Sequence, residues 1–171
     1  MNKIKKYLYV LPFALILGVT PLIVQYKRIK MGEVVSSYWI KDINTYFFSY
    51  YKMTFFLFCI LFAFIIFYIY IKKERQLKKS FYYIPLAIYT LMIIISSIFS
   101  KAKLTSLMGF PDRYEGLPVL LGYVLVIIFA INLINSEIQL EFLFKILLVS
   151  AVIIGIIGVF QFYGYDFFQS E

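Results

Sequence analysis

The stretch MTFFLFCILFAFIIFYIYI, residues 53–71, decides the fold class of this chain. It runs for 19 residues without a charged side chain. A helix needs about 20 mostly apolar residues to cross the hydrocarbon core of a bilayer. Because lipid offers no hydrogen-bond partners, the backbone there must satisfy its own polar groups, and a helix does so. The run therefore predicts a transmembrane α-helix.

The composition of the whole chain agrees with a membrane protein. Of 171 residues, 63% are hydrophobic and 15% charged, and the mean hydropathy is +0.86. Soluble domains are about 45–50% apolar and about 25% charged, and a globule of this size could not hide so much apolar surface. An ordinary soluble enzyme, a disordered chain and a fibrous repeat are therefore excluded. The formal charge is +8, but the basic residues cluster between apolar runs as juxtamembrane anchors do. We therefore expect membrane lipid, and no nucleic acid, as a partner.

Four further segments have the length and apolarity of a span, and together they predict an all-α integral membrane fold. The five expected helices cover residues 7–24, 53–71, 81–99, 118–134 and 142–163 of one membrane domain, 1–171. The first has the basic start of a signal peptide, but it is long, lacks a small-x-small cleavage site and ends in a basic cluster. It is therefore interpreted as a retained helix.

The orientation follows from the density of basic residues. Five of them lie between Lys72 and Lys79, and the N-terminal tail is similarly basic. Short basic loops resist translocation. We therefore expect a multi-pass arrangement with a cytoplasmic N-terminus and an outer location for residues 100–117.

Reactive groups are scarce. The chain has no histidine, and its single cysteine, Cys59, lies inside an apolar run. The commonest general base and the thiolate metal sites are therefore missing. We expect no catalytic residue, no metal and no cofactor in this chain.

The stretch Leu107–Pro118 is where polar chemistry concentrates. Its glycines and prolines predict a shaped turn between two apolar helices; they are Gly109, Pro111, Gly116 and Pro118. The turn carries Asp112, Arg113 and Glu115. A guanidinium there is able to bind a phosphate with paired donors. The alternative is a surface turn in which Arg113 pairs with Asp112 or Glu115 and anchors to lipid headgroups.

Small residues recur every three or four positions in the last expected helix. Ala151, Gly155 and Gly158 lie on one stripe. Such stripes allow close helix approach, so this one indicates helix packing and not a ligand site.

Two motifs resemble the O-antigen ligase/polymerase family. They are GFPDRYEGL at residues 109–117 and GIIGVFQFYGYD at residues 155–166. The resemblance covers nearly all of this chain but only the first part of a typical member. It implies a polytopic glycosyltransferase of the cytoplasmic membrane of a bacterium, which takes a glycan from undecaprenyl diphosphate in cell-surface polysaccharide assembly. It also implies that this chain is an N-terminal fragment, inactive alone, since the family's main outer loop would lie beyond residue 171.

Only Arg113 and Glu115 carry over from the family motif as charged positions. They are the candidates for binding the lipid diphosphate. The competing hypothesis is a small non-enzymatic five-helix membrane subunit, scaffold or channel component, which would associate with other membrane subunits.

Overall fold

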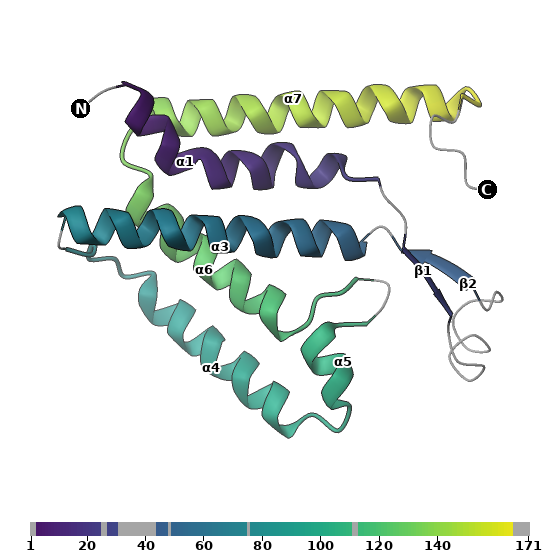
Figure 1. Ribbon diagram of the computed structural model, residues 1–171, viewed down its shortest axis with the longest axis horizontal. Helices are drawn as coiled ribbons and strands as arrows, with labels where there is room; N and C mark the ends of the chain where they lie inside the picture. Colours follow the sequence, from purple (N-terminus) through teal and green to yellow (C-terminus); the bar gives the residue numbers. More distant parts are fainter. Residues whose placement is uncertain are drawn as a thin grey trace.

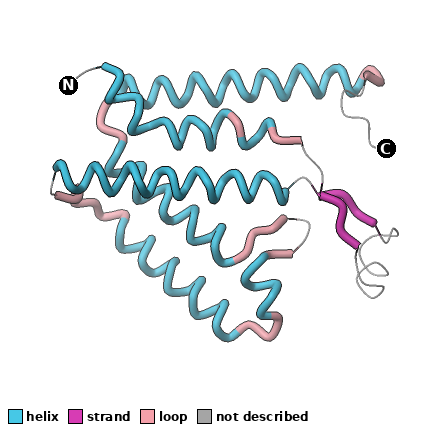
Figure 2. Tube along the Cα trace, viewed as in Figure 1, coloured by secondary structure: helices cyan, strands magenta, loops and turns pink. Residues whose placement is uncertain are grey.

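The computed structural model describes residues 3–24, 27–30, 44–47, 49–74, 76–110 and 113–165. The described residues form six α-helices, a short 3-10 helix η1 and one β-hairpin (Figures 1 and 2). The helices are α1 (Lys3–Gly18), α3 (Ser49–Glu74), α4 (Tyr83–Phe99), α5 (Lys103–Met108), α6 (Leu117–Leu133) and α7 (Glu137–Phe162), with η1 at Thr20–Leu22. Strand β1 (Lys27–Lys30) pairs antiparallel with β2 (Asn44–Phe47), with Lys27 opposite Phe47. The predicted helical fold is confirmed, and the hairpin and α5 are additions that hydropathy did not reveal.

The five longer helices lie side by side in the order α7, α1, α3, α6, α4 (Figure 1). Successive helices run back and forth between two ends of the molecule. The basic connection between α3 and α4 and the connection between α6 and α7 lie at the end near the N-terminus. The hairpin, α5 and the turn before α6 lie at the opposite end, which we call the hairpin end.

The core lies where α1 and α6 cover one face of α3. That face repeats every three or four residues, as a helix requires; its buried members are Phe56, Cys59, Ile60, Ala63, Ile66 and Tyr70. Close approach of α6 depends on Gly122, where an added Cβ would lie 2.8 Å from Cε1 of Phe56. On the other side of the row, a Cβ at Gly18 of α1 would lie 2.7 Å from Cγ2 of Ile146 in α7.

A polar lock fixes the end opposite the hairpin. The Lys78 ammonium donates to the carbonyls of Ile131 and Ile134, at 2.8 and 2.9 Å. Asn132 is fully buried; its Oδ1 accepts from the Lys78 backbone N–H at 3.0 Å and its amide donates to the Tyr83 hydroxyl at 2.8 Å. A cation bonded to the last carbonyls of a helix also suits the negative end of the helix dipole. Burial lowers the pKa of Lys78.

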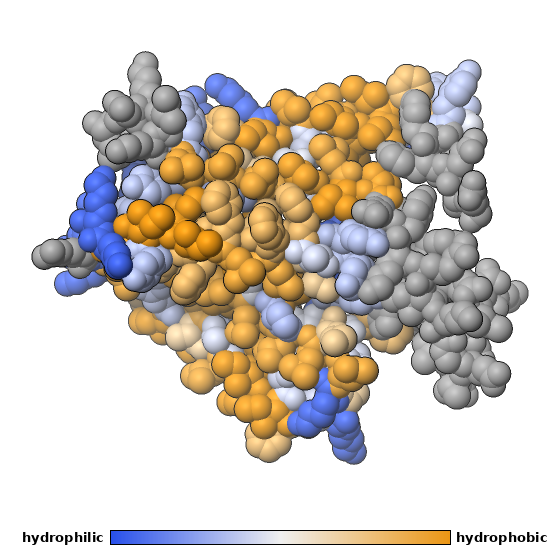
Figure 3. All heavy atoms as spheres, in the orientation of Figure 1, coloured by the Kyte–Doolittle hydropathy of each residue, from blue (hydrophilic) through white to orange (hydrophobic). Residues whose placement is uncertain are grey.

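The outer surface of the row is strongly apolar. Most of the visible body in Figure 3 is hydrophobic, with hydrophilic residues mainly toward the ends. In α7, large side chains such as Phe144, Leu148 and Val159 are more than half exposed. A monomer in water rarely exposes contiguous apolar patches above a few hundred Å². This surface is therefore suited to lipid or to other apolar partners.

Among the described helices, two are long and apolar enough to cross a membrane, and both have 26 residues: α3 and α7. Helices α1, α4 and α6 are apolar but have only 16, 17 and 17 residues. The first expected span, 7–24, is shortened because the chain leaves α1 after Gly18 and passes through η1 around Pro21.

The bounds of α7 differ from the expected 142–163 because caps, and not hydropathy, set them. Ser136 precedes the first helical residue, and Oε1 of Gln139 accepts from the backbone N–H groups of Asn135 and Ser136, at 2.8 and 3.2 Å. This Ser-x-x-Gln arrangement is a capping box. The helix therefore begins five residues earlier than the apolar run, at Glu137.

Candidate functional site

The turn before α6 is built on two glycines whose backbones touch. Gly109 has φ +81°, in the left-handed region that favours glycine. A Cβ on Gly109 would lie 2.4 Å from the Glu115 nitrogen, and one on Gly116 would lie 2.1 Å from the Leu107 carbonyl oxygen. No other residue fits either place without opening the turn. Gly109 and Gly116 therefore lie where the backbone passes closest to itself between α5 and α6.

Tyr114 anchors the turn to α3. Its side chain is 8% exposed, and its ring lies edge-on to Tyr50 with the centroids 5.3 Å apart. Burial, together with the nearby Tyr50, raises the pKa of Tyr114. The backbone of Tyr114 has φ +55°, which a non-glycine residue rarely adopts. With Tyr114 buried, its neighbours Arg113 and Glu115 are both exposed.

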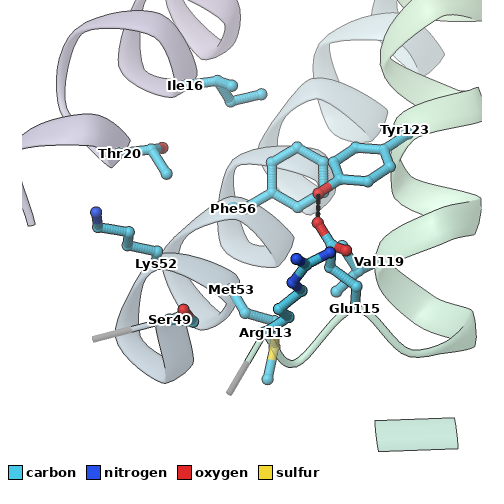
Figure 4. Close-up of a pocket in the computed structure, with 10 residues that line it drawn as sticks. All are labelled: Ile16, Thr20, Ser49, Lys52, Met53, Phe56, Arg113, Glu115, Val119 and Tyr123. Carbon is cyan, nitrogen blue, oxygen red and sulfur yellow. Dashed lines mark hydrogen bonds between the residues drawn. The ribbon is translucent and has the colours of Figure 1, made fainter. Parts of the chain in front are cut away.

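Arg113 and Glu115 face a cavity of about 310 Å³ at the hairpin end (Figure 4). Four parts of the chain line it: α1 with η1, the start of α3, the turn and the start of α6. The lining residues are Ile16, Thr20, Ser49, Lys52, Met53, Phe56, Arg113, Glu115, Val119 and Tyr123. Phe56 and Val119 are buried, so the floor of this cavity is apolar.

Two cations and one carboxylate share the rim. Neither the Lys52 ammonium nor the Arg113 guanidinium forms an ion pair or hydrogen bond with any residue that the structure describes. Glu115 instead accepts from the Tyr123 hydroxyl at 3.4 Å, and the two lie together above the turn in Figure 4. The expected pairing of Arg113 with Glu115 is therefore not seen. Its other expected partner, Asp112, lies outside the described residues.

Two residues with hydroxyl groups also line the cavity. Ser49 lines it from the first residue of α3, and Thr20 from η1. The Thr20 hydroxyl oxygen is buried and has no hydrogen-bond partner among the described residues. Phosphate oxygens accept from cations and hydroxyls alike. The donors of this rim, on Lys52, Arg113 and Ser49, therefore suit an oxyanion such as phosphate. The described residues contain no group of three or more His, Cys, Asp or Glu side chains placed to hold a metal ion.

The remaining predicted site residues lie outside the cavity or outside the described residues. Pro118 is the second residue of α6, where its missing N–H is harmless, while Pro111 lies outside the described residues. The stripe of Ala151, Gly155 and Gly158 is exposed, and a Cβ on either glycine would meet nothing within 4 Å. The stripe packs against no described residue there, so its role in helix packing stays a prediction.

The second family-like motif has a structural explanation at its last glycine. Gly164 has φ +84°, and its N–H donates to the Gln161 carbonyl at 3.0 Å. The N–H of Tyr165 donates to the Phe160 carbonyl, also at 3.0 Å. This pair of bonds is the Schellman motif that ends a helix. Gly164 therefore ends α7, whatever else the motif does.

Lys52 and Tyr123 are site residues that the sequence did not single out. Lys52 is at the start of a long apolar helix, where a lysine is ordinarily a headgroup anchor. Tyr123 is one of 16 tyrosines. Only the packing of α3 on α6 brings them to the same rim. No family model, curated protein or solved structure matches this chain.

Proposed function

We propose that this chain is a multi-pass protein of the bacterial cytoplasmic membrane that binds the diphosphate headgroup of a lipid-linked glycan at the Arg113 cavity. In this proposal it is part of an O-antigen ligase or polymerase and serves cell-surface polysaccharide assembly. One observation carries the proposal: Lys52 and Arg113 face one cavity with an apolar floor, and neither is neutralised by a described residue.

The membrane arrangement in this proposal has five spans and a cytoplasmic N-terminus. Its support is the alternating direction of successive helices and the apolar surface of the row. At about 1.5 Å per residue, the shorter helices α1, α4 and α6 extend about 25 Å, against a hydrocarbon core of about 30 Å. Local thinning of the bilayer absorbs such a mismatch at a fraction of a kcal/mol per Å. The dense basic connection after α3 then stays in the cytoplasm.

The chemistry expected of the rim is charge stabilisation. An Arg guanidinium binds two phosphate oxygens through its planar fork, whereas a Lys ammonium acts as a point charge. Above an apolar floor these interactions are screened less than in water. In glycan transfer the diphosphate leaves with growing negative charge, which two nearby cations stabilise. We assign no acid or base to this chain. Glu115 has a positioning role, because it holds Tyr123 and does not itself attract an anion.

Equilibrium binding of radiolabelled farnesyl diphosphate to the purified chain in phosphatidylcholine nanodiscs tests the proposal. Losing one charge-assisted contact of about 1.5–3 kcal/mol weakens binding about 10- to 150-fold. We expect that loss for Arg113→Lys, which keeps the charge but not the fork, and at least as large a loss for Arg113→Ala. Lys52→Ala should also weaken binding at least tenfold.

The matched control is Lys101→Ala, an exposed cation that does not line the cavity. It should bind within twofold of the wild type. Equal affinity for the wild type, Arg113→Ala and Lys52→Ala would remove the diphosphate site and leave Arg113 as a headgroup anchor.

A non-enzymatic membrane subunit is the second candidate, and the open face of α7 favours it. Gly155 and Gly158 leave room there for another helix. Surface polysaccharide in cells expressing each variant separates the two candidates. Loss of polymer in Arg113→Ala but not in Gly155→Leu supports the lipid-diphosphate site; the reverse pattern supports the subunit.

A further inference from the structure

A second cavity lies beside the cavity that Lys52 and Arg113 face; no charged side chain lines it, and its lining is mostly apolar, with Tyr50 and Tyr114 adding polar surface. Its volume is about 470 Å³, and Leu57, Leu107, Met108, Tyr114 and Pro118 form much of its wall. It shares Met53 and Val119 with the charged cavity.

The turn separates a cavity lined by charged side chains from one lined by none. Arg113 and Glu115 line the charged cavity, whereas Tyr114 and Gly116 line the apolar one. Both cavities lie at the hairpin end of α3 and α6, and both are bounded by the start of these helices. An anionic group and an apolar chain of one molecule would therefore find their sites on neighbouring sides of the same turn.

We propose that one amphiphilic lipid occupies both cavities, with its phosphate groups at Lys52 and Arg113 and the first part of its hydrocarbon chain between α3, α5 and α6. This inference rests on the proposed function and adds the path of the chain. Met53 and Met108 add flexible walls that adapt to an irregular chain.

The position of the apolar cavity favours a lipid chain over a protein segment, because the cavity adjoins the cationic rim that would hold the phosphate groups. Leu107 and Met108, 48% and 62% exposed, lie at the edge on α5 and give the chain an apolar way out to the bilayer.

The position of the bound hydrocarbon chain tests this inference better than the affinity for the lipid does. A chain that moves from lipid into an apolar cavity leaves one apolar medium for another, so the hydrophobic gain is small. The probe is a farnesyl diphosphate analogue with a diazirine on its second isoprene unit, photolysed with the full chain in phosphatidylcholine nanodiscs. The labelled residues are then mapped by mass spectrometry.

We expect the label on Leu57, Leu107 and Met108. Met108→Trp, which fills the edge of the cavity, should reduce labelling of Leu57 and Leu107 at least fivefold. The matched control is Leu104→Trp, on the same helix and 70% exposed but outside the cavity wall, and it should change labelling less than twofold. Label spread over other lipid-facing helices, with no effect of Met108→Trp, would overturn the inference.

Two further treatments test whether the labelled molecule is held by its phosphate groups. Excess inorganic diphosphate and Arg113→Ala should each reduce labelling at least tenfold if one molecule spans both cavities. Label on Leu107 and Met108 that survives both treatments would overturn the proposed function and the one-molecule assignment, while retaining an apolar ligand in the cavity. If the wild-type protein binds the headgroup as proposed but carries no label on Leu107, only the proposed path of the hydrocarbon chain is overturned.

Discussion

Replacing Gly116 by alanine gives the sharpest test of the turn that carries Arg113. The new Cβ would lie 2.1 Å from the Leu107 carbonyl oxygen and 2.6 Å from the Gly109 nitrogen. Non-bonded heavy atoms pack at about 3.5–4.0 Å, so the overlap is severe. The obstructing atoms belong to the backbone and cannot rotate away. Because the φ of Gly116 is −83°, the whole effect comes from this contact and none from the backbone conformation.

Alanine substitutions at two other glycines are controls, because they change the backbone preference without creating a close contact. Gly164 has φ +84° but open space around it, so Gly164→Ala incurs only the left-handed penalty, about 1–2 kcal/mol. Gly158 is helical and also open, so Gly158→Ala gains up to about 1 kcal/mol of helix propensity. Overpacking typically costs about 1–3 kcal/mol. For Gly116→Ala we expect the upper end, about 3 kcal/mol, limited by the free energy of opening the turn.

Cys59 is a built-in reporter for this series, because it is the only cysteine in the chain and its side chain is fully buried. Its modification by a maleimide is measured in mixed micelles of dodecylmaltoside and increasing dodecyl sulfate. The midpoint of the labelling curve gives the relative free energy of unfolding. The expected order of stability is Gly158→Ala, wild type, Gly164→Ala and Gly116→Ala, from highest to lowest. A Gly116→Ala protein within 1 kcal/mol of wild type would refute the close approach of the two arms of the turn.

Three further predictions concern topology, the polar lock and pH. In a cysteine-free background, an impermeant maleimide added to whole cells should label Ala102→Cys but not Ser80→Cys; the reverse pattern would invert the orientation. Asn132→Leu should lower the free energy of unfolding by about 1–3 kcal/mol, because the fully buried Asn132 loses its bonds to the Lys78 backbone N–H and the Tyr83 hydroxyl. The exposed Asn135 donates to the Leu133 carbonyl, so Asn135→Leu should lower it less, by about 0.5 kcal/mol, and equal effects would contradict the lock. Burial raises the pKa of Tyr114 in the folded protein, so the folded protein keeps the phenol proton to a higher pH than the unfolded chain does. The contribution of Tyr114 to the free energy of unfolding therefore falls as the pH rises above about 10. Tyr114→Phe should flatten that part of the curve of stability against pH, and an unchanged curve would contradict the burial of the hydroxyl.

Hydropathy located the long helices but not their ends. The expected segments 81–99 and 118–134 agree with α4 and α6 to within two residues, whereas α3 and α7 are longer than expected because they continue through charged residues. A helix ends where capping or a turn ends it, and Lys72, Lys73 and Glu74 still form the last turn of α3. The Ser136–Gln139 box was a readable signal for the start of α7, but an apolar count does not register it.

The candidate site, too, could be predicted from the sequence only in part. The turn could be predicted, because the glycines that shape it lie within eight residues of one another in the sequence. The cavity could not, since Lys52 and Tyr123 lie 71 residues apart and meet only because α6 packs on α3. The short helix α5, which forms one wall of the apolar cavity, has six residues and no periodic pattern long enough to detect.

The position of α6 against α3 is therefore the structural condition on which both cavities depend. Each cavity takes walls from both helices, and the contact of Gly122 with Phe56 fixes the separation of the helices at the apolar floor beneath the cationic rim. Asn132 holds the far end of α6, about 14 Å along the axis from Tyr123 at 1.5 Å per residue. Damage to that lock should lower stability and leave diphosphate affinity within about twofold, because the Gly122 contact still sets the cavity. A bulkier residue at position 122 should instead alter both, since it moves the cationic rim of α3 away from the turn that carries Arg113.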